Sequence, residues 1–170
     1  MPVANIFPTL MTDGVVYANS VPLTTTEATI GDGVQVPSGL IPIIEGQTIV
    51  AVVKLVINGL IVGNLAYVIM QTDLGDGTWI DVAWLVSTGG QGASTFVLCG
   101  GGLGQMNNAF AVTRTVGSPP TPQAAGSNVV PLGGRVRFVG KATLVSGSSS
   151  VAGTTPQVLT TITYRLQQPR

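Results

Sequence analysis

The stretch Leu65–Ser87, LAYVIMQTDLGDGTWIDVAWLVS, decides the fold class of this chain. Its two ends, Leu65–Gln71 and Thr78–Ser87, are rich in β-branched and aromatic residues, which favour strands. Between them lies the dipeptide Asp76-Gly77, which favours a tight turn because glycine readily adopts positive φ angles. The stretch therefore predicts a β-hairpin.

Short runs of the same kind recur along the chain, and no window keeps a helical period. In Arg135–Val145, apolar residues alternate with arginine, lysine and threonine, as in a strand with one buried and one solvated face. The result is about eight strands, which predicts an all-β, antiparallel β-sandwich. The strands expected beside the hairpin are Thr24–Ile30, Gln47–Ile57, Ser94–Cys99, Ala109–Val116, Arg135–Val145 and Gln157–Gln167.

The 170 residues fit a single structural domain. Prolines are spaced through residues 1–45, and this part shows little regular alternation. We expect it to be an extended N-terminal arm and edge segment, followed by the β-sandwich domain in residues 46–170. The proline-rich segment Gly117–Gly126 is expected to be a surface loop, because proline cannot donate a hydrogen bond to a strand ladder.

Charged residues make up 8% of the chain, against about 25% in ordinary soluble domains, and there is no histidine. The chain therefore lacks the commonest general base and metal ligand. The chain has a net charge of zero, whereas nucleic-acid-binding proteins usually have an excess of basic residues. The most apolar stretch, Leu40–Met70, is broken by proline, glycine and charged residues, and its part Leu55–Met70 is too short for a membrane-spanning helix and contains glycine and asparagine. We expect no enzyme activity, no cofactor, no metal, no nucleic-acid partner and no membrane partner.

Three of the expected strands are apolar on both faces, among them Gln47–Ile57 and the first strand of the hairpin. One face of such a strand lies in the sandwich core, and the other needs a second cover. A crossing loop or a second subunit would serve, and the scarcity of charge favours a subunit. We therefore predict a homo-oligomer. The predicted interface residues are Ile49, Val53, Leu55, Ile57, Leu65, Tyr67 and Ile69.

The two tryptophans lie in the second strand of the hairpin. Trp84 shares a strand face with Val82 and is expected in the core. Trp79 follows the Asp-Gly turn and shares a face with Asp81, so it is the candidate for stacking on a sugar ring or on a partner. The alternative for Trp79 is packing over the edge of the sandwich.

Two further features carry weaker chemical signals. Asp73 and Asp76 are too few, and wrongly spaced, for a calcium-binding loop. A hairpin turn is expected there, with a weak surface Ca²⁺ site as the alternative. Cys99 lies in an apolar run without a neighbouring base, and we expect it to be a small core residue.

The stretch Tyr67–Val82 runs from a strand through the Asp-Gly turn to Thr78-Trp79 and then Asp81. It resembles a hairpin of jelly-roll domains in tailed-phage virion proteins and in carbohydrate-binding sandwiches. Arg135–Phe138 and Thr161–Leu166 resemble the closing strand pair of such domains. The whole chain, poor in charge and with an extended N-terminal segment, resembles the capsid decoration (cement) proteins of bacteriophages.

The resemblance implies a jelly-roll β-sandwich in a structural protein of the virion, located on the capsid surface. Such a protein binds the major capsid protein, often as a trimer around a symmetry axis. The same resemblance leaves two alternatives. One is a carbohydrate-binding module for host-surface attachment, in which Trp79 contacts a glycan, although the further aromatic residues of a sugar platform are missing. The other is a phage tail structural protein.

Overall fold

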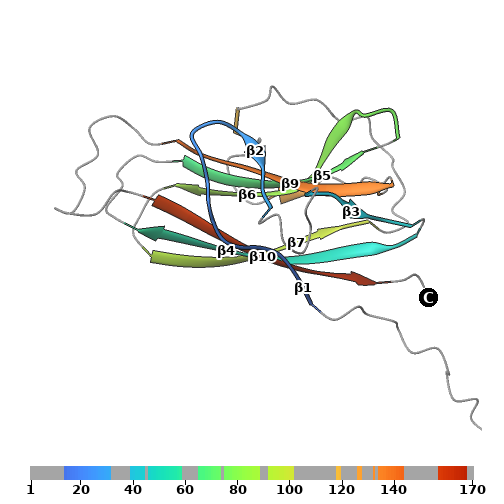
Figure 1. Cartoon of the computed structure of the whole chain (residues 1–170), viewed down its shortest axis with the longest axis horizontal. Helices are drawn as coiled ribbons and strands as arrows, with labels where there is room; N and C mark the ends of the chain where they lie inside the picture. The colour runs from blue at the N-terminus through green and yellow to red at the C-terminus, as the bar shows by residue number, and fades with distance from the viewer. Residues whose placement is uncertain are drawn as a thin grey trace, which may run out of the picture.

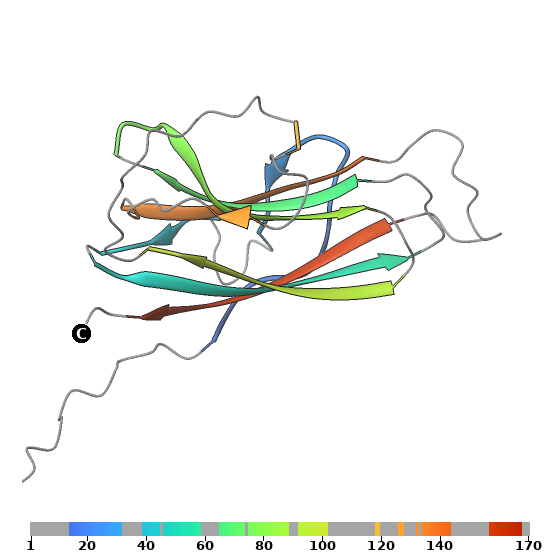
Figure 2. The same ribbon diagram turned by 180° about the vertical axis from the view of Figure 1, so that it is seen from behind.

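The described part of the chain is all-β and forms two antiparallel sheets that lie face to face (Figures 1 and 2). Within that part there are ten strands and no helix, so the predicted all-β, antiparallel β-sandwich is confirmed. The computed structural model describes residues 14–31, 39–44, 46–58, 65–73, 75–88, 92–101, 118–119, 126–127, 132, 134–143 and 157–167.

Sheet A, the lower layer in Figure 1, has four strands in the order β1-β10-β4-β7. The two central strands pair in unbroken register over eleven residues, from Gln157 opposite Asn58 to Gln167 opposite Thr48. The strands of sheet A are β1 (Val15–Pro22), β10 (Gln157–Gln167), β4 (Thr48–Asn58) and β7 (Gly92–Gly100).

Sheet B, the upper layer, has six strands in the order β2-β9-β5-β6-β8, and β3 also pairs with β9. Its three long strands form the central ladder, and its three short strands lie at the edges. The strands of sheet B are β2 (Ala28–Thr29), β3 (Ile41–Pro42), β5 (Leu65–Asp73), β6 (Trp79–Thr88), β8 (Gly126–Ser127) and β9 (Arg135–Thr143).

The antiparallel strand pairs are nested along the chain, each pair enclosing the next one in sequence. The innermost pair is β5 with β6, followed outward by β4 with β7, by β2 and β3 with β9, and by β1 with β10. Successive pairs alternate between sheet B and sheet A. The chain therefore winds as a double ribbon around a core, which buries one face of every long strand.

Most of the long strands expected from the sequence are present. The predictions for β4, β5, β6, β7 and β10 are confirmed to within two residues at each end, and β9 is confirmed as far as Thr143. The expected strand Ala109–Val116 lies outside the described residues. Two predictions are wrong in detail. Only Ala28–Thr29 of the expected strand Thr24–Ile30 forms a strand, although the backbones of Thr24 and Ile30 also hydrogen-bond to β9. Gly126, expected in a loop, pairs with Trp84 in β6.

The N-terminal part contributes strands to both sheets. Within residues 1–45, β1 forms an edge of sheet A, and β2 and β3 pair with β9 in sheet B. Tyr17, Ile30, Ile41 and Ile43 from this part are buried in the core between the sheets. The sandwich therefore includes residues on the N-terminal side of position 46, which the frequent prolines concealed in the sequence.

Tyr17 links the two sheets at the centre of the core. Its hydroxyl donates to the carbonyl oxygen of Gly39 at 2.7 Å and accepts from the amide of Phe138 at 3.3 Å. The rings of Tyr17 and Phe138 meet edge to face with centroids 4.9 Å apart. Burial raises the pKa of Tyr17 to about 12. Gly39 has φ +65°, and a Cβ there would lie 2.7 Å from the Thr29 methyl group, so this contact requires glycine.

Candidate functional site

The predicted interface residues of β4 lie inside the sandwich. Ile49, Val53, Leu55 and Ile57 are 0–8% exposed and pack in the core between the two sheets. The prediction that they form an intersubunit surface is wrong. Both faces of β4 are apolar, and only the position of β4 in the centre of sheet A shows that its odd-numbered residues point inward.

The predicted interface residues of β5 are also covered by the chain itself. Tyr67 and Ile69 lie on the face of sheet B that is remote from sheet A, where they form a second apolar cluster with Trp84 and Val139. All four are 0–5% exposed, so the expectation that another subunit covers Tyr67 and Ile69 is wrong. The Tyr67 hydroxyl donates to Oε2 of Glu27 at 2.7 Å. The side chain of Leu65 lies outside the described part of the structure.

Among the described residues, exposed large apolar side chains lie instead on the outer face of sheet A and at Ile44, between β3 and β4. Val52 of β4 is opposite Val97 of β7, and these side chains are 43% and 61% exposed. Cys99, opposite Val50, is exposed, so its expected place in the core is wrong. The register defines this outer face as Val50, Val52, Lys54, Val56, Ala93, Thr95, Val97, Cys99, Leu159, Thr161, Thr163 and Arg165.

The charges on the outer face of sheet A are of one sign. Lys54 and Arg165 are both exposed, and none of the twelve positions that define the face is acidic. The remaining positions carry valine, alanine, leucine, cysteine or threonine. This surface is largely uncharged and apolar or hydroxyl-bearing, which is the composition of a contact surface more than of a free one.

A polar ladder crosses the outer face of sheet B at the end near the hairpin turn. In the first row, Asp73 of β5 lies between Trp79 of β6 and Arg135 of β9. In the next outward-facing row on the same three strands, Gln71 of β5 lies between Asp81 of β6 and Arg137 of β9. The Gln71 amide donates to Asp81 at 2.7 Å and accepts from Nε of Arg137 at 2.9 Å. The ladder residues are Asp73, Trp79, Arg135, Gln71, Asp81 and Arg137.

Trp79, the candidate for ligand stacking, is stacked within this ladder. The guanidinium carbon of Arg137 lies 4.0 Å from the centroid of its ring system, and that of Arg135 lies 5.8 Å away. Burial lowers the pKa of Arg137, which nevertheless stays cationic, so the contact is a cation–π interaction. Trp79 is half-buried, and part of its ring surface is already occupied by a side chain of its own chain.

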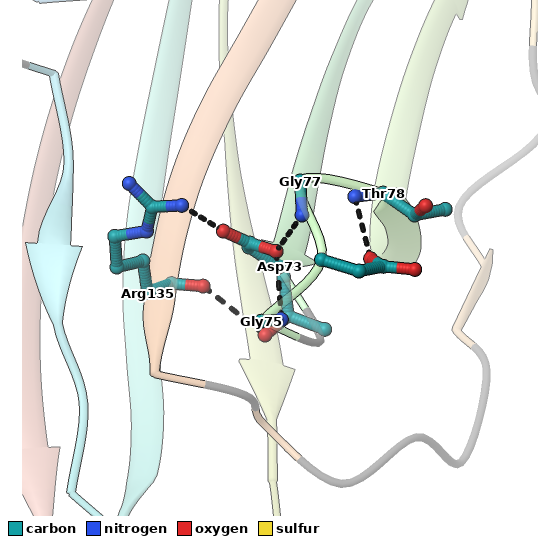
Figure 3. Close-up of polar contacts among 7 residues, drawn as sticks. Asp73, Gly75, Gly77, Thr78 and Arg135 are labelled. Atoms are coloured by element: carbon teal, nitrogen blue, oxygen red, sulfur yellow. Dashed lines mark hydrogen bonds and ion pairs between the residues drawn. The ribbon is translucent and has the colours of Figure 1, made fainter.

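The carboxylates beside Trp79 build the hairpin turn, as Figure 3 shows. Oδ1 of Asp73 accepts from the amides of Gly75 at 2.8 Å and Gly77 at 3.1 Å, and Oδ2 accepts from Arg135. The Gly75 amide, followed by the Arg135 guanidinium and the Gly77 amide, holds the pKa of Asp73 below its usual range. Asp76 accepts from the amide of Thr78 at 2.8 Å, which likewise lowers its pKa.

The expected hairpin turn is therefore confirmed, and both carboxylates serve it. Gly75 and Gly77 have φ of 103° and 85°, which the turn requires and which glycine adopts without strain. Among the described residues, no group of three or more histidine, cysteine, aspartate or glutamate side chains could hold a metal ion. The ladder places guanidinium groups and a half-buried tryptophan ring side by side on the outer face of sheet B.

Comparisons with known proteins leave the family open. No protein-family model matches the chain, and no curated protein matches it either. Within the described ranges, no helix has the length and apolar character needed to cross a membrane.

Sequence reasoning singled out Trp79 but missed its partners, Arg135 and Arg137. The alternation of Arg135–Val145 placed these arginines on one face, but only the pairing of β9 with β5 brings them to Trp79.

Proposed function

We propose that the protein is a structural component of a virion: a capsid decoration or minor head protein that binds the shell as a homo-oligomer. The proposal includes the assignment of the sandwich to the jelly-roll fold. The nested pairs, alternating between the sheets, support that assignment, since a jelly roll consists of two Greek keys wound in this way. Jelly rolls are common in capsid proteins and in lectins, so this support is an analogy of fold.

The outer face of sheet A is the observation that carries the proposal. Val52, in the central strand β4, and Val97, in the edge strand β7, remain 43% and 61% exposed on it, directly opposite each other. Burying these exposed fractions against a shell would contribute about 2 kcal/mol per copy, or about a thirtyfold gain in affinity. The proposed role is binding without bond chemistry.

The mechanism would be mass action. A protein that binds the assembled shell, and not its separated subunits, stabilises the shell by the free energy of binding. An oligomer engages several sites at once, so a modest contact per copy gives a high total affinity. The cations Lys54 and Arg165 on this face favour a neutral or acidic partner surface.

The direct test is the composition of particles purified from cells that express the native gene. Quantitative mass spectrometry should find many copies per particle, in a fixed ratio to the major shell protein. Separation of heads from tails then assigns the protein to one of them, so that recovery with tails alone supports the tail alternative. Absence from particles would refute the virion role.

A pair of variants tests the surface. Val52→Lys places a charge at the centre of the outer face of sheet A and should reduce the number of bound copies at least tenfold. Thr25→Lys adds the same charge at an exposed position between β1 and β2 and should leave binding unchanged. Equal binding by both variants would show that this face is not the contact surface. Binding to immobilised glycans that is lost on Trp79→Ala would instead favour the carbohydrate-binding alternative.

A further inference from the structure

The two edge strands of sheet A differ in how well they are protected against pairing with another strand. β1 carries two register shifts against β10, a positive φ at Ser20 and a proline at position 22. Irregularities and prolines of this kind are the devices by which natural sheets block edge-to-edge association. β7 is more regular: it pairs with β4 in unbroken register from Gly92 to Gly100, contains no charge and no proline, and has a positive φ at its first residue, Gly92.

The unprotected edge is also accessible. Every residue from Gly92 to Thr95 is exposed, including Ser94, which lies opposite the buried Leu55. Among the residues that the structure describes, β4 is the strand hydrogen-bonded to β7. A strand of nine residues offers a regular row of backbone amides and carbonyls on its other side, where no further described strand pairs with it.

We propose that β7 pairs with β7 of a second copy of this chain, antiparallel and around a two-fold axis. The register centred on Phe96 pairs all nine residues and sets Thr95 opposite Val97 of the second copy. Two-fold contacts are self-complementary, so the same edge serves both copies. The proposal goes beyond the virion role and does not depend on it.

Three features favour a second copy of this chain as the occupant. First, β7 carries no charge that would repel its own image. Second, the cations of β4 stay apart, since three strand spacings separate the two Lys54 backbones by about 14 Å, beyond the Debye length of about 8 Å. Third, the joined sheet ends in the protected strand β1 on both sides, so the assembly closes as a dimer and does not grow into a fibre.

The test uses complementary charges at the two facing positions in the purified full-length chain. Sedimentation velocity from 1 to 100 µM should detect a dimer of the unchanged chain. Val97→Lys and Thr95→Glu should each weaken the dimer about tenfold or more when alone, because diagonal neighbours then carry like charges. An equimolar mixture should restore it, since the introduced lysine and glutamate lie directly opposite each other in the mixed dimer.

Val52→Lys is the matched control, because it adds a charge to the same sheet face on β4, away from the edge. It should leave the dimer intact. Circular dichroism of each variant checks that it is folded. A monomer at all concentrations, a trimer, a dimer broken by Val52→Lys, or no recovery on mixing would each overturn the proposal. None of these outcomes decides whether the protein is present in purified particles, so the two proposals fail separately.

Discussion

Tyr17→Phe removes one oxygen atom from the point where the two sheets and residue 39 meet. In the folded chain this oxygen donates to the Gly39 carbonyl at 2.7 Å and accepts from the Phe138 amide at 3.3 Å. Tyr17 is fully buried, so water cannot replace either bond without opening the core. The ring contact with Phe138 is kept by the substitution. The variant therefore isolates the hydroxyl group.

The magnitude follows from the groups that lose a partner. A net hydrogen bond contributes about 1 kcal/mol, and a buried polar group left unpaired costs about 1–3 kcal/mol. We expect the free energy of unfolding at pH 7 to fall by about 2–3 kcal/mol, which corresponds to a decrease in Tm of about 4–12 °C for a chain of this size.

The same hydroxyl gives the wild-type protein a defined alkaline pH dependence. Burial raises the pKa of Tyr17 to about 12 from an ordinary value of 10. Below pH 10 the hydroxyl is protonated in both states and its stabilising effect is complete. Between pH 10 and 12 the unfolded chain loses this proton first, so the stabilisation falls by up to about 2.7 kcal/mol. The phenylalanine variant lacks this loss, so the stability difference between the two proteins should narrow as the pH rises.

Urea unfolding at pH 7, 9 and 11.5, followed by circular dichroism, measures both effects. Tyr164→Phe is the matched control, because Tyr164 is also buried but its hydroxyl makes no hydrogen bond among the described residues. Its cost at pH 7 should be below about 1 kcal/mol. A Tyr17→Phe protein as stable as wild type at pH 7, or a difference that stays constant up to pH 11.5, would refute the role assigned to this hydroxyl.

Three further predictions concern other parts of the sandwich. Thr160→Val should leave stability unchanged or raise it by up to about 2 kcal/mol in urea unfolding, because the buried Thr160 hydroxyl has no hydrogen-bond partner among the described residues; a loss above 1 kcal/mol would contradict this. Asp73→Asn should reduce the loss of folding stability that occurs as the pH is lowered. In the unchanged chain, the lowered pKa of Asp73 stabilises the fold above the ordinary pKa of aspartate, and this stabilisation is lost as the pH falls through the pKa of the folded state. Unfolding midpoints from pH 2 to 7 check this, and an unchanged acid limb would count against it. Arg137→Ala should cost about 1–2 kcal/mol and change the fluorescence of Trp79, because it removes the stacked guanidinium, whereas an unaltered emission spectrum would argue against the cation–π contact.

The local features of the fold were readable in the sequence because each depends on neighbouring residues. Turn chemistry at Asp76-Gly77 and the β-branched runs on either side predicted β5 and β6, and alternation predicted β9. The same signals failed for the N-terminal strands, because β2 and β3 are two residues long and carry no periodic pattern. Such short strands form through the pairing offered by β9, which lies more than ninety residues away in the chain.

Which face of a strand is buried was decided by the tertiary structure. The sequence placed Trp84 on one face with Val82, but β6 carries one extra residue where Ala83 pairs with Met70 and Asp81 pairs with Gln71. This bulge turns Val82 into the core between the sheets and Trp84 into the cluster on the outer face of sheet B. A shift of one residue exchanges the two faces of a strand, and no local pattern records it.

The sequence by itself therefore determined the long strands from β4 onward, the hairpin turn and the scarcity of charge, because these depend on residue types and near neighbours. The tertiary structure alone decided that Ile49, Val53 and Leu55 are core, that Val52 and Val97 are surface, and that Arg137 stacks on Trp79. These outcomes depend on the order and register of strands distant in the chain, where hydrogen-bonded pairing sets which side chains meet.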